Sequence, residues 1–311
     1  MVKYIFICCP GHSGSTLLDL LIGSHSRVRS LGEISHLSKN IALNTPCSCG
    51  VAVKECSFWK KIIQFLSEST RIDILKDPYA FNLGQPKSFD VIDHVYQTRM
   101  FLLRNKLMRG LVYHELRYGP DILKFLKKSF HKSITNNLIL YDTILSSLSE
   151  DIVVDSTKDY LKAVGVYRKR PDNTRIILLS RDGRGVLYSR IKRGVKRRVG
   201  VASWKNYYSR GMPVLYRHIS DEHILRIQYE RLASEPETVL KVLTQFLEIE
   251  YEGSMLDFSN YTHHVTNGNN MRFIKSASIQ VDESWKSNLL EEDIQYFNYH
   301  AGAMNRRLGY Y

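Results

Sequence analysis

The 311-residue chain has no apolar run of about 20 residues, the length that a membrane-spanning helix needs. The apolar stretch at Tyr4–Cys8 is much shorter, and it lacks the longer core and the cleavage site of a secretion signal. The chain also has no internal repeat and no low-complexity linker that would mark a domain boundary. We therefore expect a soluble, cytoplasmic protein with no membrane span.

Cysteine is scarce, and the chain contains five: Cys8, Cys9, Cys47, Cys49 and Cys56. The first two end an apolar run and are predicted to be small buried residues. The other three form a group, but their C-x-C spacing fits zinc poorly, because a zinc site normally has four ligands. A reducing compartment disfavours a disulfide. We therefore predict packed thiols beneath Phe58 and Trp59 and no metal, with a metal site as the alternative.

What the chain does contain is a strand, a loop of small residues and a helix within Ile5–Leu21, which reads IFICCPGHSGSTLLDLL. The apolar run is typical of a buried parallel strand, and Leu17, Leu18 and Leu21 follow at helical spacing. Free backbone N–H groups at a helix start, next to hydroxyls, bind phosphate or sulfate. The segment therefore predicts a cradle for an anion, such as part of a nucleotide.

This loop lacks the lysine of a kinase-type P-loop, G-x-x-x-x-G-K-[ST]. Ser15 follows Gly14 where that motif has lysine, and Cys9 stands where it has its first glycine. The stretch PGHSGSTLL instead resembles the 5′-phosphosulfate-binding loop of sulfotransferases, which use 3′-phosphoadenosine 5′-phosphosulfate (PAPS). The bacterial-type members and the protein-tyrosine sulfotransferases carry P-x-R-S-G-[ST]-T-L loops, and the arginine of that pattern is His12 here.

A second segment supports the resemblance. Thr174–Leu179 is typical of a buried strand and leads into RDGRGVLYSR, which is similar to the family's R-D-[GP]-R-A-x-x-x-S. An arginine at a strand end can direct two donors to a phosphate. In the family, this arginine and a serine eight residues later hold the 3′-phosphate of the donor. Arg181 and Ser189 have the same spacing.

Shorter stretches are similar to other segments of the bacterial-type family: LGE at 31–33, CSCG and CSFW within 47–59, YERL and PE within 229–237, and HHV, GN, Arg272 and Trp285 within 263–285. The resemblance therefore covers both ends and the middle of the chain. Residues 60–150 carry no motif of the family.

Four strands are predicted, at about 3–9, 152–155, 175–180 and 223–229. They alternate with helices, which indicates one parallel sheet covered on both faces. We expect an α/β fold, a P-loop-like three-layer α/β/α architecture with a central parallel sheet, in a single domain over residues 1–311. Helical patterns around 91–110 and 132–149 predict a helical cap, inserted at roughly 60–150.

The resemblance implies where the donor binds. The loop would hold the 5′-phosphosulfate, and Arg181, Ser189 and Arg272 the 3′-phosphate, while Tyr229 would lie against the adenosine or a phosphate. The predicted donor-binding residues are Gly11, His12, Ser13, Gly14, Ser15, Thr16, Arg181, Ser189, Tyr229 and Arg272. Adenosine 3′,5′-bisphosphate (PAP) is the product. No metal is expected, because basic residues take the place of magnesium.

Three residues are predicted to take part in catalysis. Glu33 lies in a Gly-Glu stretch like the one that carries the base in tyrosine-sulfating relatives, and it is the predicted base for the acceptor's proton, with His36 as the alternative. Lys158 lies at the polar end of a predicted strand, where ligands bind in open α/β sheets, in a stretch that resembles the family's D-S-[ST]-K. The resemblance to tyrosine-sulfating relatives, in which a lysine of the comparable segment assists the leaving group, implies the same role for Lys158. His12 supplies charge only if it is protonated, and otherwise a hydrogen bond.

The net charge of +13 favours acidic ligands, and the basic run Arg190–Arg198 predicts a funnel for PAPS. No nucleic-acid-binding motif is present, so no nucleic acid partner is expected. The predicted reaction transfers a sulfuryl group to a hydroxyl or amine of a small-molecule metabolite. The alternatives are a nucleoside-triphosphate-dependent phosphotransferase on the same fold, or sulfation of a glycan or a peptide tyrosine. The sequence leaves the oligomeric state open.

Overall fold

The computed structural model describes residues 1–84, 99–119, 127–274 and 278–311. Within these residues, the central sheet has five parallel strands in the order β2-β3-β1-β4-β5. The strands are β1 (Tyr4–Cys8), β2 (Val28–Ser30), β3 (Ile152–Asp155), β4 (Thr174–Ser180) and β5 (Ile224–Gln228). Four of them lie where the sequence predicts strands. The sequence did not predict β2, because its three residues are too few to show a periodic pattern.

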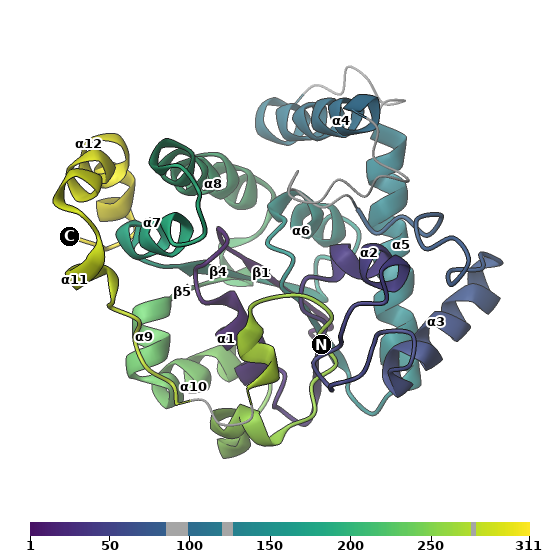
Figure 1. Cartoon of the computed structure of the whole chain (residues 1–311). Coiled ribbons are helices and arrows are strands. Elements are labelled where there is room, and N and C mark those ends of the chain that lie inside the picture. The colour runs from purple at the N-terminus through teal and green to yellow at the C-terminus, as the bar shows by residue number, and fades with distance from the viewer. Residues whose placement is uncertain (85–98, 120–126, 275–277) are drawn as a thin grey trace.

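Helices cover both faces of this sheet (Figure 1). Because successive side chains of a strand point to opposite faces, Tyr4 and Phe6 of β1 enter one core, and Ile5 and Ile7 enter the other. The Ile5 core is completed by α1 (Ser15–Ile22), α9 (Tyr229–Ser234) and α10 (Pro236–Phe246). The Tyr4 core includes α5 (Lys128–Ser147), α6 (Tyr160–Tyr167), α7 (Gly183–Ile191), α8 (Arg197–His218) and α12 (Glu291–Arg307). The predicted three-layer α/β/α architecture is confirmed.

The segment between β2 and β3 supplies further helices on the right-hand side of Figure 1. They are α2 (Leu37–Ala42), α3 (Ser57–Thr70), α4 (Arg99–Tyr118) and α5. The helix predicted around 132–149 is confirmed by α5, and α4 covers the described part of the one predicted around 91–110. Residues 91–98 lie outside the described residues. Tyr141 of α5 is buried in the same core as Tyr4 and Phe6 of β1, so α5 packs directly against the sheet.

The remaining helical elements are short. One is α11 (Trp285–Asn288), and the others are 3₁₀ turns at Ile34–His36, Asp221–His223, Gly253–Asn260 and Asn270–Phe273. In the part of the chain that the structure describes, no helix is both long and apolar enough to cross a membrane. The division into one domain with an inserted cap stays a prediction.

The carboxyl ends of the parallel strands meet at one edge of the sheet, where ligands bind in open α/β folds. β1 leads there into the loop before α1, β3 into Ser156–Asp159, and β4 into Arg181. The chain after β2 follows the same edge, because Ser156 donates its backbone N–H to the carbonyl of Gly32 at 3.0 Å. Glu33 is thereby placed beside the end of β3.

Candidate functional site

The loop between β1 and α1 has the conformation of an anion cradle. Gly14 adopts a left-handed backbone (φ +85°), and a Cβ at this position would lie 2.3 Å from the ring of Tyr229. α1 then begins at Ser15 with no acidic residue in its first turn. The first N–H groups of a helix have no partner within the helix, and they favour negative charge. The loop is therefore suited to a phosphate or a sulfate.

Cationic side chains lie near this loop, but His12 itself is not one of them. Burial, followed by the fields of nearby cations, lowers the pKa of His12 from 6.5 to about 4, so its imidazole is neutral near pH 7. The cations that act on it are Arg193, Arg190, Lys158 and Arg181. They come from three separate segments of the chain. The basic run predicted as a funnel thus places two arginines beside the anion cradle.

Arg181 joins the anion cradle to a late segment of the chain. Its side chain is buried, and Nη1 donates to the carbonyl of His12 at 3.1 Å. Nη2 donates to Asp282 Oδ2 at 3.0 Å, and the guanidinium lies 4.4 Å from the centre of the Tyr229 ring. The half-exposed Asp282 carboxylate therefore occupies part of the fork that the sequence assigns to a phosphate. No sequence motif predicted Asp282 as a partner of Arg181.

The structure places the other predicted donor-binding residues around the same edge. Ser189 lies in the second turn of α7 and is half-buried. The loop at residues 263–274 is called the late loop here. Its Asn269 donates the backbone N–H to Thr16 Oγ1 at 3.2 Å, so the late loop contacts the first turn of α1. Arg272 of this loop is held by the carbonyl of Gly268 at 3.5 Å. Burial lowers the pKa of Arg272. The fields of Cys47 and Glu33 act in the opposite direction and raise it, but by less than burial lowers it.

Glu33 and Lys158, predicted separately, form an ion pair through Oε1 and Nζ. Burial acts to lower the pKa of Lys158, but Glu33, Cys9 and Asp19 together outweigh it, and the net shift is upward. Asn267 Nδ2 of the late loop lies 3.4 Å from Glu33 Oε2, and His36 Nε2 lies 3.6 Å from the same oxygen. Burial lowers the pKa of His36. A carboxylate, an ammonium and an imidazole therefore meet at one point.

Two residues of this site hold left-handed backbones without being glycine: His12 (φ 71°) and Lys158 (φ 68°). Such conformations are uncommon outside glycine, and they persist where surrounding contacts fix them. The carbonyl of His12 accepts from Arg181, and the carbonyl of Lys158 accepts from the hydroxyl of Tyr207 at 2.9 Å. Arg181, which follows β4, and Tyr207 of α8 thus hold the backbone at these two positions.

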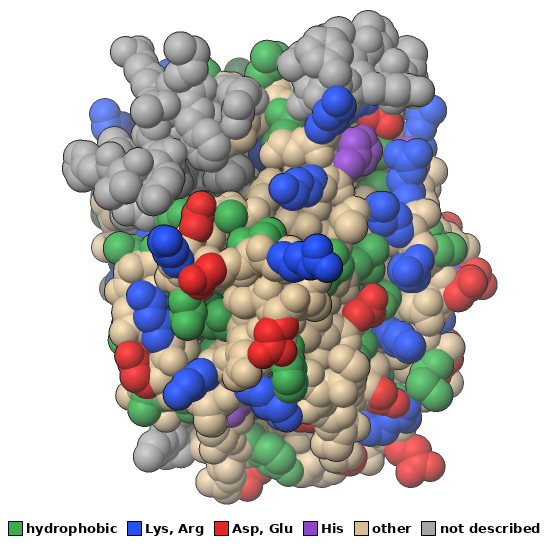
Figure 2. Space-filling model, turned by 90° about the vertical axis from the view of Figure 1, so that its right-hand side faces the viewer, with side chains coloured by type: hydrophobic (Ala, Val, Ile, Leu, Met, Phe, Trp, Pro, Cys, Tyr) green, Lys and Arg blue, Asp and Glu red, His purple; other side chains and the backbone are tan. Residues whose placement is uncertain are grey.

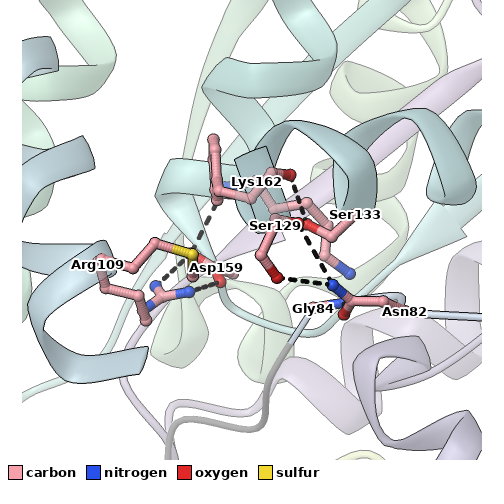
Figure 3. Close-up of a pocket in the computed structure, with 9 residues that line it drawn as sticks. Asn82, Gly84, Arg109, Ser129, Ser133, Asp159 and Lys162 are labelled. Atoms are coloured by element: carbon pink, nitrogen blue, oxygen red, sulfur yellow. Dashed lines mark hydrogen bonds and ion pairs between the residues drawn. The ribbon is translucent and has the colours of Figure 1, made fainter. Parts of the chain in front are cut away.

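Asp159, the residue after Lys158, connects the site to α4 (Figure 3). Arg109 of α4 binds its carboxylate with both terminal nitrogens, at 2.7 and 2.9 Å. Asp159 also accepts from the N–H of Leu161 and thereby caps α6. The cavity that Arg109 and Asp159 line together with Asn82 has a volume of about 10 Å³, which is room for about one water molecule. This cavity is too small to hold an acceptor.

Asp19 is a buried carboxyl on α1 that the sequence analysis missed. It lies inside an apolar helix, a position where a pattern-based analysis expects a core residue. Burial raises the pKa of Asp19 to about 7, against the hydrogen bond from Ser30 Oγ at 2.6 Å and the field of Lys158. Asp19, with a pKa of about 7, therefore lies close enough to Lys158 and Glu33 for their charges to act on it.

Basic and acidic side chains alternate over the side of the molecule that is on the right in Figure 1. Figure 2 shows this face, where Lys and Arg are interspersed with Asp and Glu. Proteins that bind nucleic acid usually show a continuous basic stripe. Among the described residues of this face, Asp, Glu and uncharged side chains separate Lys and Arg, which form no continuous stripe. The expectation of no nucleic acid partner stays a prediction.

Comparisons with known proteins give a family for this chain. Residues 4–253 match the sequence pattern of the sulfotransferase family. A search of curated proteins found no match to this chain.

Two solved structures are similar to the whole chain. The sulfotransferase domain from the curacin biosynthetic pathway is 16% identical, with a TM-score of 0.53 over 100% of this chain and 99% of that one. The sulfotransferase domain from the Synechococcus PCC 7002 olefin synthase is 15% identical, with a TM-score of 0.50 over 97% of this chain and 94% of that one. At these identities the similarity supports the fold alone.

Proposed function

Because the chain belongs to the sulfotransferase family, whose members use PAPS, we propose that it moves the sulfuryl group of PAPS to a hydroxyl or amine of a small-molecule acceptor. The observation that carries this proposal is the Glu33–Lys158 ion pair beside the loop of His12. The pair combines a carboxylate that can accept a proton with an ammonium that can stabilise a leaving group. Both lie at the edge of the sheet that carries the anion cradle.

The donor would bind along this edge in the orientation that the resemblance implies. The loop Gly11–Thr16 would hold the 5′-phosphosulfate through backbone N–H groups and hydroxyls. Arg181 and Ser189 would hold the 3′-phosphate, and Asp282 would leave the guanidinium as the phosphate arrives. This exchange is favourable, because a phosphate accepts from both arms of a guanidinium and carries more charge than a carboxylate.

The chemistry proposed is an in-line transfer. The bond between sulfur and the acceptor atom forms as the bond between sulfur and the bridging oxygen of the phosphosulfate breaks. Glu33 accepts the proton of the acceptor, and Lys158 donates a hydrogen bond to the bridging oxygen, where negative charge develops. His12, neutral before the donor binds, donates a hydrogen bond to the sulfuryl oxygens. Positioning and charge stabilisation supply most of the rate enhancement in such transfers.

The acceptor is proposed to reach this pair from the side of α4 and α5. The contact between Arg109 and Asp159 places α4 directly beside the segment that carries Lys158. The acceptor class proposed is a small-molecule metabolite, and a glycan or peptide tyrosine is the alternative. A phosphotransferase is disfavoured, since the loop lacks the lysine that binds nucleoside triphosphates.

Replacing the proposed base tests this mechanism. Glu33→Gln removes the proton acceptor, so turnover should fall about 10²- to 10⁴-fold, while PAP still binds with the wild-type affinity. Release of PAP from PAPS is measured with panels of hydroxyl and amine acceptors, and PAP affinity by calorimetry. The matched control is Glu55→Gln, an exposed carboxylate bonded to Asn44. Full turnover by Glu33→Gln would refute Glu33 as the base and direct attention to His36.

A further inference from the structure

Four ligand-type side chains converge outside the anion cradle. Cys47 and Cys49 lie on the turn after α2, and Cys56 lies at the start of α3. The fourth is His264, from the late loop more than two hundred residues further along the chain. The three sulfurs and one ring nitrogen all lie within 4.8 Å of one another. The sequence analysis counted three ligands here, and the structure adds the fourth.

The ligand distances are close to those of a tetrahedral metal site, although the ligand atoms spread over up to 4.8 Å. Zinc–sulfur bonds of about 2.3 Å place two sulfurs about 3.8 Å apart, and a zinc-bound nitrogen about 3.6 Å from a sulfur. The sulfurs of Cys49 and Cys56 are 3.6 Å apart, and Cys56 Sγ lies 3.2 Å from His264 Nδ1. A disulfide would need about 2.05 Å between sulfurs. None of the five cysteines, which all belong to the described residues, forms a disulfide.

We propose that Cys47, Cys49, Cys56 and His264 bind one zinc ion. Three thiolates and an imidazole form a ligand set that zinc prefers over magnesium or calcium, which take oxygen ligands. Four protein ligands leave no open position, so the site is structural rather than catalytic. Cys47 and Cys56 are fully buried and Cys49 is half-buried, which shields the ion from solvent.

The surroundings hold the ligands in place. The backbone N–H of Cys47 donates to the carbonyl of Val51 at 2.8 Å, and Gly50 turns the chain with a left-handed φ of +97°. The ring of His264 stacks on Phe58 at 5.1 Å between centroids, with 19° between their planes. Trp59 Nε1 donates to the carbonyl of His264 at 2.8 Å. Such outer contacts are typical of metal sites, where they orient the ligating side chains.

The zinc site would fasten the late loop to the turn after α2. Next to it, Ser48 donates its N–H to the carbonyl of Val265 at 3.0 Å, and Val265 donates its own N–H to Ser48 Oγ at 2.8 Å. A few residues on, the same loop contacts Glu33 through Asn267 and Thr16 through Asn269. The consequence for donor binding rests on the proposed function: the ion would fix the loop that borders both the base and the anion cradle.

Metal content tests the site without using PAPS. The full chain, purified without chelators or a histidine tag, should contain about one zinc ion per chain by elemental mass spectrometry. His264→Ala and Cys49→Ser should lose most of it. The matched controls Cys8→Ala, a thiol outside the cluster, and His300→Ala, an exposed histidine, should keep it. His264→Cys should also keep zinc, because it restores a fourth soft ligand even if the alanine variant folds poorly.

Cobalt substitution identifies the ligands by spectroscopy. Wild-type protein reconstituted with Co²⁺ should show the visible bands of a tetrahedral thiolate site, and those bands should shift in His264→Cys. The proposal is overturned by wild-type protein that holds no stoichiometric zinc, by zinc retained in both His264→Ala and Cys49→Ser, or by a Cys49–Cys56 disulfide in mass spectra. None of these readouts involves the nucleotide. Failure of the zinc site would therefore leave the proposed transfer reaction standing, and failure of the transfer reaction would leave the zinc site standing.

Discussion

At the scale of single residues, His12 stands where related loops carry arginine, yet its surroundings keep it neutral. Burial, followed by the fields of four cations, lowers its pKa to about 4, and Arg181 donates to its carbonyl. Charge that one loop arginine would supply comes instead from residues on other elements. Lys158 differs from His12, since its partnership with Glu33 keeps it charged. The positive charge next to this loop therefore comes from Arg193, Arg190, Lys158 and Arg181.

The lowered pKa of His12 predicts a pH dependence of stability. In the unfolded chain the imidazole binds a proton as the pH falls below about 6.5, whereas in the folded chain it does so only near 4. The unfolded state binds more protons at His12 in this window, so the contribution of His12 to the free energy of unfolding falls from pH 6.5 towards 4 and is constant above this window. His12→Gln should therefore lose less stability on acidification than the wild type.

Urea unfolding at pH 8, 6 and 5 measures this difference. His36 and His263, whose pKa values burial also lowers, titrate in both proteins, so their contributions cancel in the comparison. If the free energies of unfolding of the wild type and of His12→Gln differ by the same amount at all three pH values, the buried imidazole of His12 does not cause the loss of stability on acidification.

At the scale of elements, the turn into α1 depends on Gly14. Its left-handed φ and the 2.3 Å approach of Tyr229 leave no room for a side chain. Gly14→Ala adds about 1–2 kcal/mol of backbone strain and a collision with the ring, so the loop should shift and PAP affinity should fall at least about tenfold. The control is Gly253→Ala, where a Cβ meets open space. Calorimetry that finds equal PAP affinity in both variants would rule out this loop as the phosphosulfate site.

The sequence predicts features that lie within one continuous segment, but it does not predict contacts between residues that are far apart in the chain. The strand–loop–helix units at 5–21 and 174–190 are continuous segments with their own periodicity, so their secondary structure was predictable. Their anion-binding role stays a prediction. The pairing of Glu33 with Lys158 spans 125 residues, and that of Cys56 with His264 spans 208. No periodicity in a single sequence reports such contacts. Asp282 was missed for the same reason, because its partner Arg181 lies 101 residues away.

At the scale of the whole molecule, one buried network joins the sheet to the helices over the Tyr4 face. Asp155, at the end of β3, accepts from Tyr141 of α5 at 2.6 Å and from Lys162 of α6 at 2.9 Å. Both charged side chains are almost fully buried. Asn137 of α5 accepts from Lys162 Nζ at 3.2 Å. The network therefore fixes the two helices that flank the polar end of β3, where Lys158 begins its turn.

Removing the cation of this network should destabilise the fold. Lys162→Met leaves Asp155 buried without its counter-ion, which costs about 3–5 kcal/mol of unfolding free energy. The double variant Asp155→Asn, Lys162→Met should be less destabilised than the sum of the single changes, because each removes the same interaction. The control Lys286→Met breaks an exposed pair with Glu283 and should change stability by about 0.5 kcal/mol or less. A Lys162→Met cost no greater than the control, by urea unfolding, would show that the pair is not a stabilising link.

The most direct test of the donor site is calorimetric titration of the chain with PAP and, separately, with ATP and magnesium. We predict PAP binding with a dissociation constant of about 1 μM or tighter, and little binding of ATP. Arg181→Ala should weaken PAP binding about 10- to 100-fold, because it removes charge-assisted hydrogen bonds, whereas the exposed Arg231→Ala should not. Tighter binding of ATP with magnesium than of PAP, or an Arg181→Ala affinity equal to that of the wild type, would contradict the assignment of this edge of the sheet to PAPS.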